Sequence, residues 1–199
     1  MDVRIVTCVG KAVKPHLQAL ARLRIAVFRD YPYLYDGDMT YEQRYLEAYA
    51  RSARSVFVLA LDGDTPVGCS TGIPLADEIP AIQQPFVERA TPPDHVFYFG
   101  ESVLLPAYRG QGIGHRFFDA RERHARSLGG YRWTAFCAVE RSADDPRRPP
   151  HYRPNDAFWV KRGYQRQNDM FCALEWTETG AASPASHRLR FWLRPIHDQ

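Results

Sequence analysis

The spacing of apolar residues predicts two helices and a hairpin in the first part of the chain. Apolar side chains recur every three or four positions over 17–28 and again over 40–49, where the first residues match a capping-box motif. The polar, Pro- and Gly-containing stretch 30–38 between them is predicted to be a loop. Two strand-like runs then flank an Asp-Gly-Asp turn at 62–64. The pattern therefore predicts helix, loop, helix and hairpin.

A strand, a glycine-rich turn and a helix follow one another near the middle of the chain. The run His95–Leu105 is aliphatic and aromatic, which predicts one central strand that ends before Pro106. After the turn, apolar residues at helical spacing predict a helix from Ile113 to Leu128, and 131–139 reads as the next strand. A crossover of this length allows the two strands to run parallel. We therefore expect a βαβ unit.

The rest of the chain completes an α+β pattern. A basic, Pro-rich loop is predicted at 141–154, a short helix from Asn155 to Gly163, and strands near 167–177 and 187–194. We expect a mixed, mostly antiparallel sheet of about seven strands with about four helices. A chain of 199 residues is long enough for one hydrophobic core, so residues 1–199 are predicted to form a single domain.

Composition and charge exclude several classes of protein. Hydrophobic residues make up 45% of the chain and charged residues 25%, as in ordinary globular domains. The net charge is only +3 and the basic residues are mixed with acids, which argues against a nucleic-acid partner. No apolar run is long enough to cross a membrane and the N-terminus lacks a basic leader, so a cytoplasmic protein is expected. The four cysteines and seven histidines show no metal-ligand spacing, and no metal is expected.

The turn Arg109-Gly110-Gln111-Gly112-Ile113-Gly114 stands at the start of the predicted helix. The first backbone N–H groups of a helix have no internal partner, and the helix dipole adds positive potential there. Glycines let the backbone approach a bulky anion, so a phosphate or pyrophosphate ligand is predicted. A Walker loop would need Lys and a hydroxyl residue where His115 and Arg116 stand, and a dinucleotide fingerprint would need a third glycine at position 115.

The same turn resembles the acyl-CoA pyrophosphate loop of the GNAT superfamily of N-acyltransferases. That loop has Arg or Gln, two residues, Gly, one residue, and then Gly or Ala. The preceding Val103-Leu104-Leu105-Pro106 and the order of elements from about 55 to 195 are similar to the family as well. The resemblance implies an N-acetyltransferase in which a primary amine attacks the thioester of acetyl-CoA directly, and it leaves a longer acyl donor open. The cofactor-binding residues it implies are Val103, Leu104, Arg109, Gly110, Gln111, Gly112, Ile113, Gly114 and Asn155.

The resemblance also suggests which groups move protons. An attacking amine must lose a proton, and Glu101 is the candidate base because it is the one carboxylate in the expected strand beside the thioester. The alternative is that Glu101 pairs with an arginine and only orders the strand. Many family members carry a tyrosine that acts as the general acid where this chain has Trp159, four residues before Gly163. Tyr152, Tyr164 and solvent remain the alternatives for the general acid.

In this family the loop between the first two helices largely selects the acceptor. Here that loop contains Tyr31, Tyr33, Tyr35 and Asp36, which suit a cationic amine through cation–π and charge contacts. The alternative is that these tyrosines only pack the loop. The basic loop 141–154 offers contacts to the phosphates of CoA or to an acidic group on the acceptor.

Three questions remain open from the sequence. The acceptor is either a small molecule or a peptide. A non-catalytic acyl-CoA-binding or sensing module of the same fold is the second hypothesis, because Trp159 replaces the usual tyrosine. Homodimers are common in the family, but no feature of the sequence identifies an interface.

Overall fold

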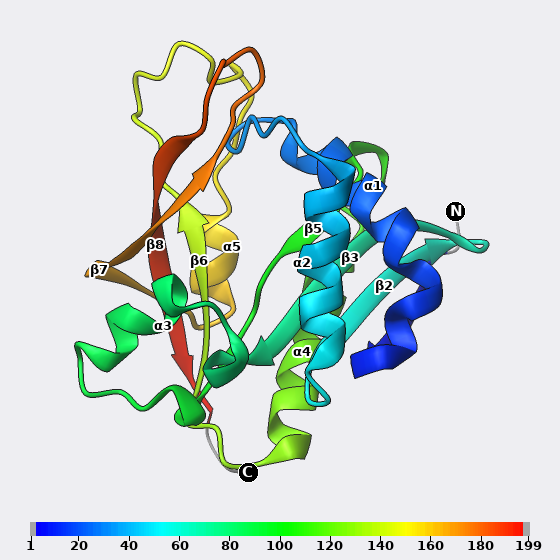
Figure 1. The fold of residues 1–199 in the computed structure, drawn as a ribbon, viewed down its shortest axis with the longest axis vertical. Helices are drawn as coiled ribbons and strands as arrows, with labels where there is room; N and C mark the ends of the chain where they lie inside the picture. The colour runs from blue at the N-terminus through cyan, green and yellow to red at the C-terminus, as the bar shows by residue number, and fades with distance from the viewer. Residues whose placement is uncertain (1–2, 197–199) are drawn as a thin grey trace.

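The computed structural model describes residues 3–196 and shows a single twisted sheet with helices on both faces (Figure 1). The strands are β1 (Val3–Val9), β2 (Val56–Asp62), β3 (Thr65–Pro74), β4 (Val96–Tyr98), β5 (Ser102–Leu104), β6 (Trp133–Val139), β7 (Gln165–Trp176) and β8 (Ala185–Pro195). The helices are α1 (Leu17–Phe28), α2 (Met39–Arg51), α3 (Pro80–Val87), α4 (Ile113–Leu128) and α5 (Asp156–Lys161).

The sheet is mostly antiparallel, as predicted. Its order is β1-β2-β3-β4-β6-β8-β7, and β5 pairs with β3 outside this path. Among residues 3–196 the one parallel pair joins β4 to β6, with Val96 opposite Trp133, and α4 lies between these two strands in the chain. The α+β class and the βαβ unit are therefore confirmed.

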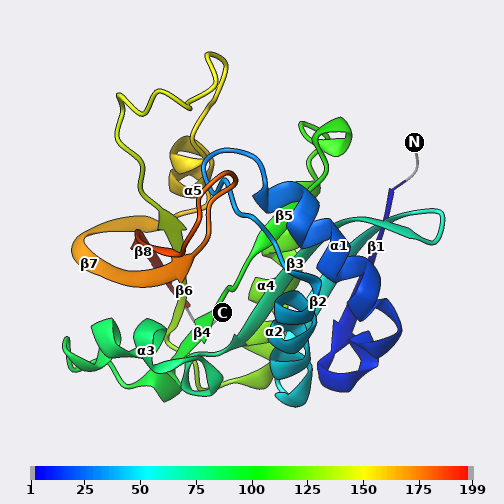
Figure 2. The same cartoon turned by 45° about the horizontal axis from the view of Figure 1, so that its top comes forward.

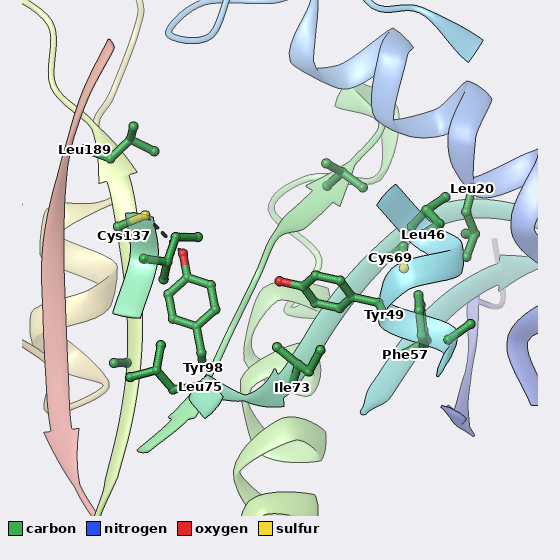
Figure 3. Close-up of a cluster of buried hydrophobic side chains, with 14 of the residues drawn as sticks. Leu20, Leu46, Tyr49, Phe57, Cys69, Ile73, Leu75, Tyr98, Cys137 and Leu189 are labelled. Carbon is green, nitrogen blue, oxygen red and sulfur yellow. Dashed lines mark hydrogen bonds between the residues drawn. The ribbon is translucent and has the colours of Figure 1, made fainter. Parts of the chain in front are cut away.

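Two hydrophobic clusters hold the helices against the sheet. Buried residues of α1, α2 and α3 pack on one face, and those of α4 pack on the other, where partly buried Phe158 and Trp159 of α5 join them. Figure 3 shows the first cluster, where Leu20 and Leu46 lie over Phe57 while Tyr98 points at Cys137. The Tyr98 hydroxyl lies 3.0 Å from the Cys137 sulfur. Within residues 3–196, no helix is both long and apolar enough to cross a membrane.

Two local predictions were wrong at the start of the chain. The sequence pattern did not reveal β1, which pairs with β2 along its whole length. The capping box did not form at the start of α2, because the N-cap is Asp38 and its carboxylate accepts a hydrogen bond from Tyr41 N at 2.8 Å. A carboxylate satisfies a free N–H at a helix start as well as a hydroxyl does.

The predicted central strand His95–Leu105 is broken, which corrects the expectation of one continuous strand. Phe99 still bonds to β6, with its N–H 2.7 Å from Ala135 O, but Gly100 N instead donates to Thr71 O of β3 at 3.2 Å. A Cβ at position 100 would lie 2.5 Å from the Tyr49 hydroxyl, so only glycine allows this close approach. Beyond the break the chain follows β3 alone as β5. As a result, β5 and β6 diverge.

Candidate active site

A cavity of about 720 Å³ opens where β5 and β6 diverge. Residues 99–102 and Leu104 line one side, and residues 136–141 line the other. The start of α4, Arg148 and residues 151–156, together with residues 30–33 between α1 and α2, complete its walls. This size is typical of cavities that hold a cofactor and a small ligand.

The glycine turn has the geometry that anion binding requires. Gly110 and Gly112 have φ of +77° and +76°, in the left-handed region, and Gly112 is the N-cap of α4. A Cβ built on either glycine would meet no atom within 4 Å, so both face open space. Arg109 lines the cavity, and its Nε donates to Leu104 O at 3.1 Å, which ties the turn to the end of β5. The free N–H groups of the first turn of α4 are therefore presented beside the cavity.

The other residues of the turn have separate roles. The side-chain amide of Gln111 donates to Ala107 O at 3.2 Å. Ile113 is buried and anchors the helix start in the second core cluster, while Gly114 lines the cavity. Leu104 also lines it, whereas Val103 is fully buried opposite Cys69 of β3. The predicted cofactor residues thus gather at the diverging strand and the helix start.

The residues predicted near α5 lie in different environments. Asn155 is exposed and borders the cavity, and its side chain forms no cap on the helix. Trp159 packs against Phe136 and Trp192, with ring centres 5.0 and 5.1 Å away. Of the two tyrosines, Tyr152 lines the cavity. Tyr164 is buried, and its hydroxyl faces Thr134 and Glu122 at 3.0 and 3.3 Å.

Glu101 lies in the break between β4 and β5 and lines the cavity. Its Oε2 accepts hydrogen bonds from the hydroxyls of Tyr45 and Thr71, both at 2.9 Å. Its Oε1 lies 2.8 Å from Nη1 of Arg24. Glu101 therefore pairs with an arginine, as one alternative from the sequence expected, and it also borders the cavity, as a candidate base must.

Arg24 of α1 joins Glu101 to a second buried carboxylate, Glu42 of α2. Arg24 Nε pairs with Glu42, which is fully buried, and the guanidinium lies 4.1 Å from the ring centre of Tyr45. Burial alone lowers the pKa of Arg24, but the facing Glu101 and Glu42 outweigh it and raise that pKa well above its usual value. The sequence held a signal for this group, because Arg24 falls on the apolar face of its predicted helix.

We expect Arg24→Met to destabilise the fold by about 3–5 kcal/mol, because it leaves two buried carboxylates without their cation. Urea denaturation monitored by circular dichroism measures this change. Arg22→Met is the matched control, since Arg22 is exposed on the same helix. A loss below about 1 kcal/mol, as for a surface ion pair, would contradict the assignment of a buried charge network.

Arg121 of α4 contacts the strand break from the face of the sheet that α4 covers. It is 1% exposed, and its Nη1 donates to Thr71 O and Glu101 O at 3.3 and 3.2 Å. The guanidinium stacks on Phe99 and Phe118, and burial lowers the pKa of Arg121 to about 10. Each carbonyl also accepts a backbone N–H, Thr71 O from Gly100 and Glu101 O from Thr71, so Arg121 adds a second hydrogen bond to each and ties α4 to the break. The sequence signal was a charged residue four positions after Phe117 on the buried helix face.

The predicted acceptor loop divides into two parts. Tyr31 and Tyr33 line the cavity, where Tyr31 meets Tyr152 edge-on at 4.7 Å and Tyr33 packs on Phe28 at 4.5 Å. Tyr35 and Asp36 lie outside the cavity lining, next to the turn between β7 and β8. Among residues 3–196, no group of three or more His, Cys, Asp or Glu side chains is arranged to hold a metal ion.

The comparison with known families agrees with this geometry. Residues 20–164, more than half of the chain, match the model of the acetyltransferase (GNAT) family. No protein with a curated description is similar enough in sequence to match the chain.

Solved structures share the fold at low sequence identity. One is yncA of Salmonella typhimurium, described as an acetyltransferase with its cofactor acetyl-CoA, with 10% identity, a TM-score of 0.63, and 100% of this chain and 96% of that chain covered. Another is ribosomal-protein-alanine N-acetyltransferase of Brucella melitensis, with 13% identity, a TM-score of 0.61, and 96% and 99% covered. An N-acetyltransferase of Staphylococcus aureus has 13% identity, a TM-score of 0.59, and 96% and 98% covered. The chain therefore belongs to the GNAT family of acetyltransferases, enzymes that use acetyl-CoA as co-substrate.

Proposed function

We propose that this protein is an N-acetyltransferase that moves the acetyl group of acetyl-CoA to a primary amine by direct attack. The observation that carries the proposal is one cavity with a glycine turn at the start of α4 and Glu101 in the strand break. Anion binding and proton removal are the two tasks that such a transfer needs, and these two features serve them. When bound, acetyl-CoA supplies an activated acyl group as a thioester.

The chain's own residues would divide the work. The N–H groups of Gly110 to Gly114 would hold the pyrophosphate, because they stand at a helix start where Gly110 and Gly112 border open space. The free edge of β5 at Val103 and Leu104 would hold the pantetheine arm and aim an N–H at the thioester oxygen. Asn155 borders the same cavity and would contact the cofactor from α5.

Glu101 would accept the proton of the amine, directly or through water. Its carboxylate is held in place by Tyr45, Thr71 and Arg24, so it needs no rearrangement to face the cavity. Of the candidates Tyr152 and Tyr164, only Tyr152 borders the cavity, which supports it as the group that would reprotonate the departing thiolate. Tyr31 and Tyr33 would border the acceptor, and Tyr35 and Asp36 would support that loop from outside.

A second candidate function is a non-catalytic acyl-CoA-binding or sensing module. The observation in its favour is Trp159, which packs into the core where many family members present a tyrosine hydroxyl. It predicts binding of the cofactor without acetyl transfer.

The first experiment is a calorimetric titration of the purified protein with acetyl-CoA and with longer acyl-CoAs. Thiol release is then followed with a panel of amines, amino acids and peptides. Binding followed by release with some amine supports the transferase. Binding with no release from any acceptor favours the sensing module, and no binding contradicts both functions.

A further inference from the structure

A second buried carboxylate, Glu78, contacts α2 as Glu101 does. Glu78 lies between β3 and α3 and is buried, although its neighbours Asp77 and Ile79 are exposed. This segment runs beside the end of α2 (Figures 1 and 2), where Ser52 Oγ donates to Asp77 Oδ2 at 2.6 Å. Glu78 therefore stands at the edge of the core, next to solvent.

Among residues 3–196, no positive charge pairs with Glu78. Burial raises the pKa of its carboxyl, and hydrogen bonds from the Tyr49 hydroxyl and a backbone N–H only partly offset this. A carboxylate is rarely buried in this way without a cation, which suggests a role beyond packing. The titratable groups around it are neutral or negative: Tyr45 and Tyr49 of α2, Tyr98 of β4, Cys137 of β6, Cys172 of β7, and Glu101.

The Tyr49 hydroxyl connects Glu78 to the strand break. It donates a hydrogen bond to Glu78 Oε1, and it lies so close to Gly100 that a Cβ there would be 2.5 Å away. Figure 3 shows the Tyr49 ring extending from α2 toward the side of the core cluster where Tyr98 lies. Tyr49 therefore reaches from the edge of the core to the residue that precedes Glu101.

Tyr45 completes the connection to Glu101. It stands one turn before Tyr49 in α2, with the two ring centres 4.9 Å apart, and its hydroxyl donates to Glu101 Oε2 at 2.9 Å. Burial raises the pKa of Tyr45 well above its usual value, and a hydrogen bond with the Tyr49 hydroxyl acts in the opposite direction. Burial also raises the pKa of Tyr49. Both phenols therefore keep their protons near neutral pH, and each can accept one hydrogen bond while it donates another.

The proposed acetyl transfer leaves a proton on Glu101 that must depart before the next turnover. As the C–N bond forms and the C–S bond breaks, one proton of the ammonium ends on the thiolate and a second on the base. Arg24, Tyr45 and Thr71 hold the Glu101 carboxylate in place, so it does not turn toward solvent. The cofactor and the product fill the cavity at that moment, so another route out is needed.

We propose that Tyr45, Tyr49 and Glu78 carry this proton from the base to the surface beside α3, and we call them the relay residues. Glu101 gives its proton to the Tyr45 oxygen, and the Tyr45 proton passes to Tyr49. The Tyr49 proton passes to Glu78, which releases it to water, so that only O–H bonds form and break. Charge sets the direction, because Glu101 faces Arg24 whereas Glu78 faces no cation. The inference rests on the proposed acetyltransferase function and on Glu101 as its base.

Glu78→Gln and Tyr49→Phe test the relay, because neither residue lines the cavity or bonds to Glu101. With the best acceptor of the panel and dilute buffer, each is expected to lower kcat about 10-fold while acetyl-CoA affinity stays unchanged. The first turnover should keep its rate, because the first proton transfer to Glu101 does not depend on the relay. Rapid-quench measurement of the acetylated amine should therefore show a burst of about one equivalent followed by slow turnover.

Matched variants on the same helix control for general damage. Glu47→Gln and Tyr41→Phe make the same chemical changes at exposed positions of α2, and neither should change kcat. The double variant of Tyr49 and Glu78 should be no slower than either single variant, because two breaks in one path cost no more than one.

A small diffusible buffer supplies a second readout. A tertiary-amine buffer cannot be acetylated, and at high concentration it can take the proton from Glu101 through the open cavity after the product leaves. We expect it to restore most of kcat in the relay variants at constant ionic strength, with no effect on the unmodified protein. A purely structural defect would not respond to buffer.

Unchanged kcat in Glu78→Gln would overturn the inference, as would a first turnover slowed as much as kcat, a loss that buffer does not restore, or an equal loss in Glu47→Gln. Urea denaturation shows whether Tyr49→Phe still folds. If it does not, Glu78→Gln decides the result by itself, since glutamine keeps the shape of the side chain. Thiol release from none of the amines, in unmodified protein that binds acetyl-CoA, contradicts the proposed function itself and removes the inference with it.

Discussion

Gly112→Asp is expected to weaken acetyl-CoA binding about 30-fold or more, the largest effect on cofactor affinity of any single change considered. Gly112 caps α4 with φ of +76°, and the space where its Cβ would lie is open. A carboxylate there would stand where the helix start otherwise attracts the pyrophosphate. Losing this attraction and adding repulsion costs about 2 kcal/mol, which corresponds to about 30-fold in Kd. Isothermal titration calorimetry measures the change directly.

Gly112→Asn is the matched control for this prediction. Asparagine has the same shape as aspartate and a similar tolerance of the left-handed region, but it carries no charge. We expect its acetyl-CoA affinity to lie much nearer to that of the unmodified protein. Equal losses in the two variants would indicate backbone strain, and unchanged binding in Gly112→Asp would show that the anion binds elsewhere.

Glu101→Gln is expected to lower kcat/KM about 100-fold or more at neutral pH, with acetyl-CoA affinity unchanged. A positioned general base contributes about 10²–10⁴-fold to rate, and glutamine keeps the shape of the side chain while it cannot accept the proton. Steady-state thiol release with the best acceptor of the panel measures the loss. Urea denaturation of the same variant measures how much stability the lost ion pair with Arg24 contributes.

The pH dependence distinguishes a base from a structural carboxylate. As pH rises, a growing fraction of the acceptor amine is already deprotonated in solution and needs no base. We therefore expect the rate ratio between the unmodified protein and Glu101→Gln to fall steadily between neutral pH and pH 10. A ratio that stays constant with pH would indicate that Glu101 acts only by ordering the strand break.

The order of elements and the glycine turn could be predicted from the sequence because both are local. Helical and strand periodicities identified α1, α4, β2, β3 and β6 within a few residues of their observed bounds. The glycine turn was equally clear, since left-handed backbone and free N–H groups are properties of a short segment. The family resemblance followed from these same residues and is confirmed over residues 20–164.

Features that depend on partners far apart in the chain could not be predicted this way. The segment 95–105 was predicted as one strand because its sequence is apolar throughout. It breaks after Tyr98 because Gly100 lies against Tyr49 of α2 and bonds to Thr71 of β3, which are distant in the chain. β1 was missed for a related reason, since its seven residues gain their structure by pairing with β2. A strand's hydrogen bonds are made with another part of the chain, so its ends are decided there.

The sequence by itself determined that this protein has a βαβ unit with a glycine turn at the helix start, and it identified Glu101 as the carboxylate in the first expected strand of that unit. Only the tertiary structure decided that Glu101 meets Arg24 from α1, and that Glu140 pairs with three arginines of β7 and β8. The physical reason is the separation along the chain of the residues that interact. Backbone conformation follows from neighbours in the chain, whereas burial and charge pairing depend on which distant side chains the fold brings together.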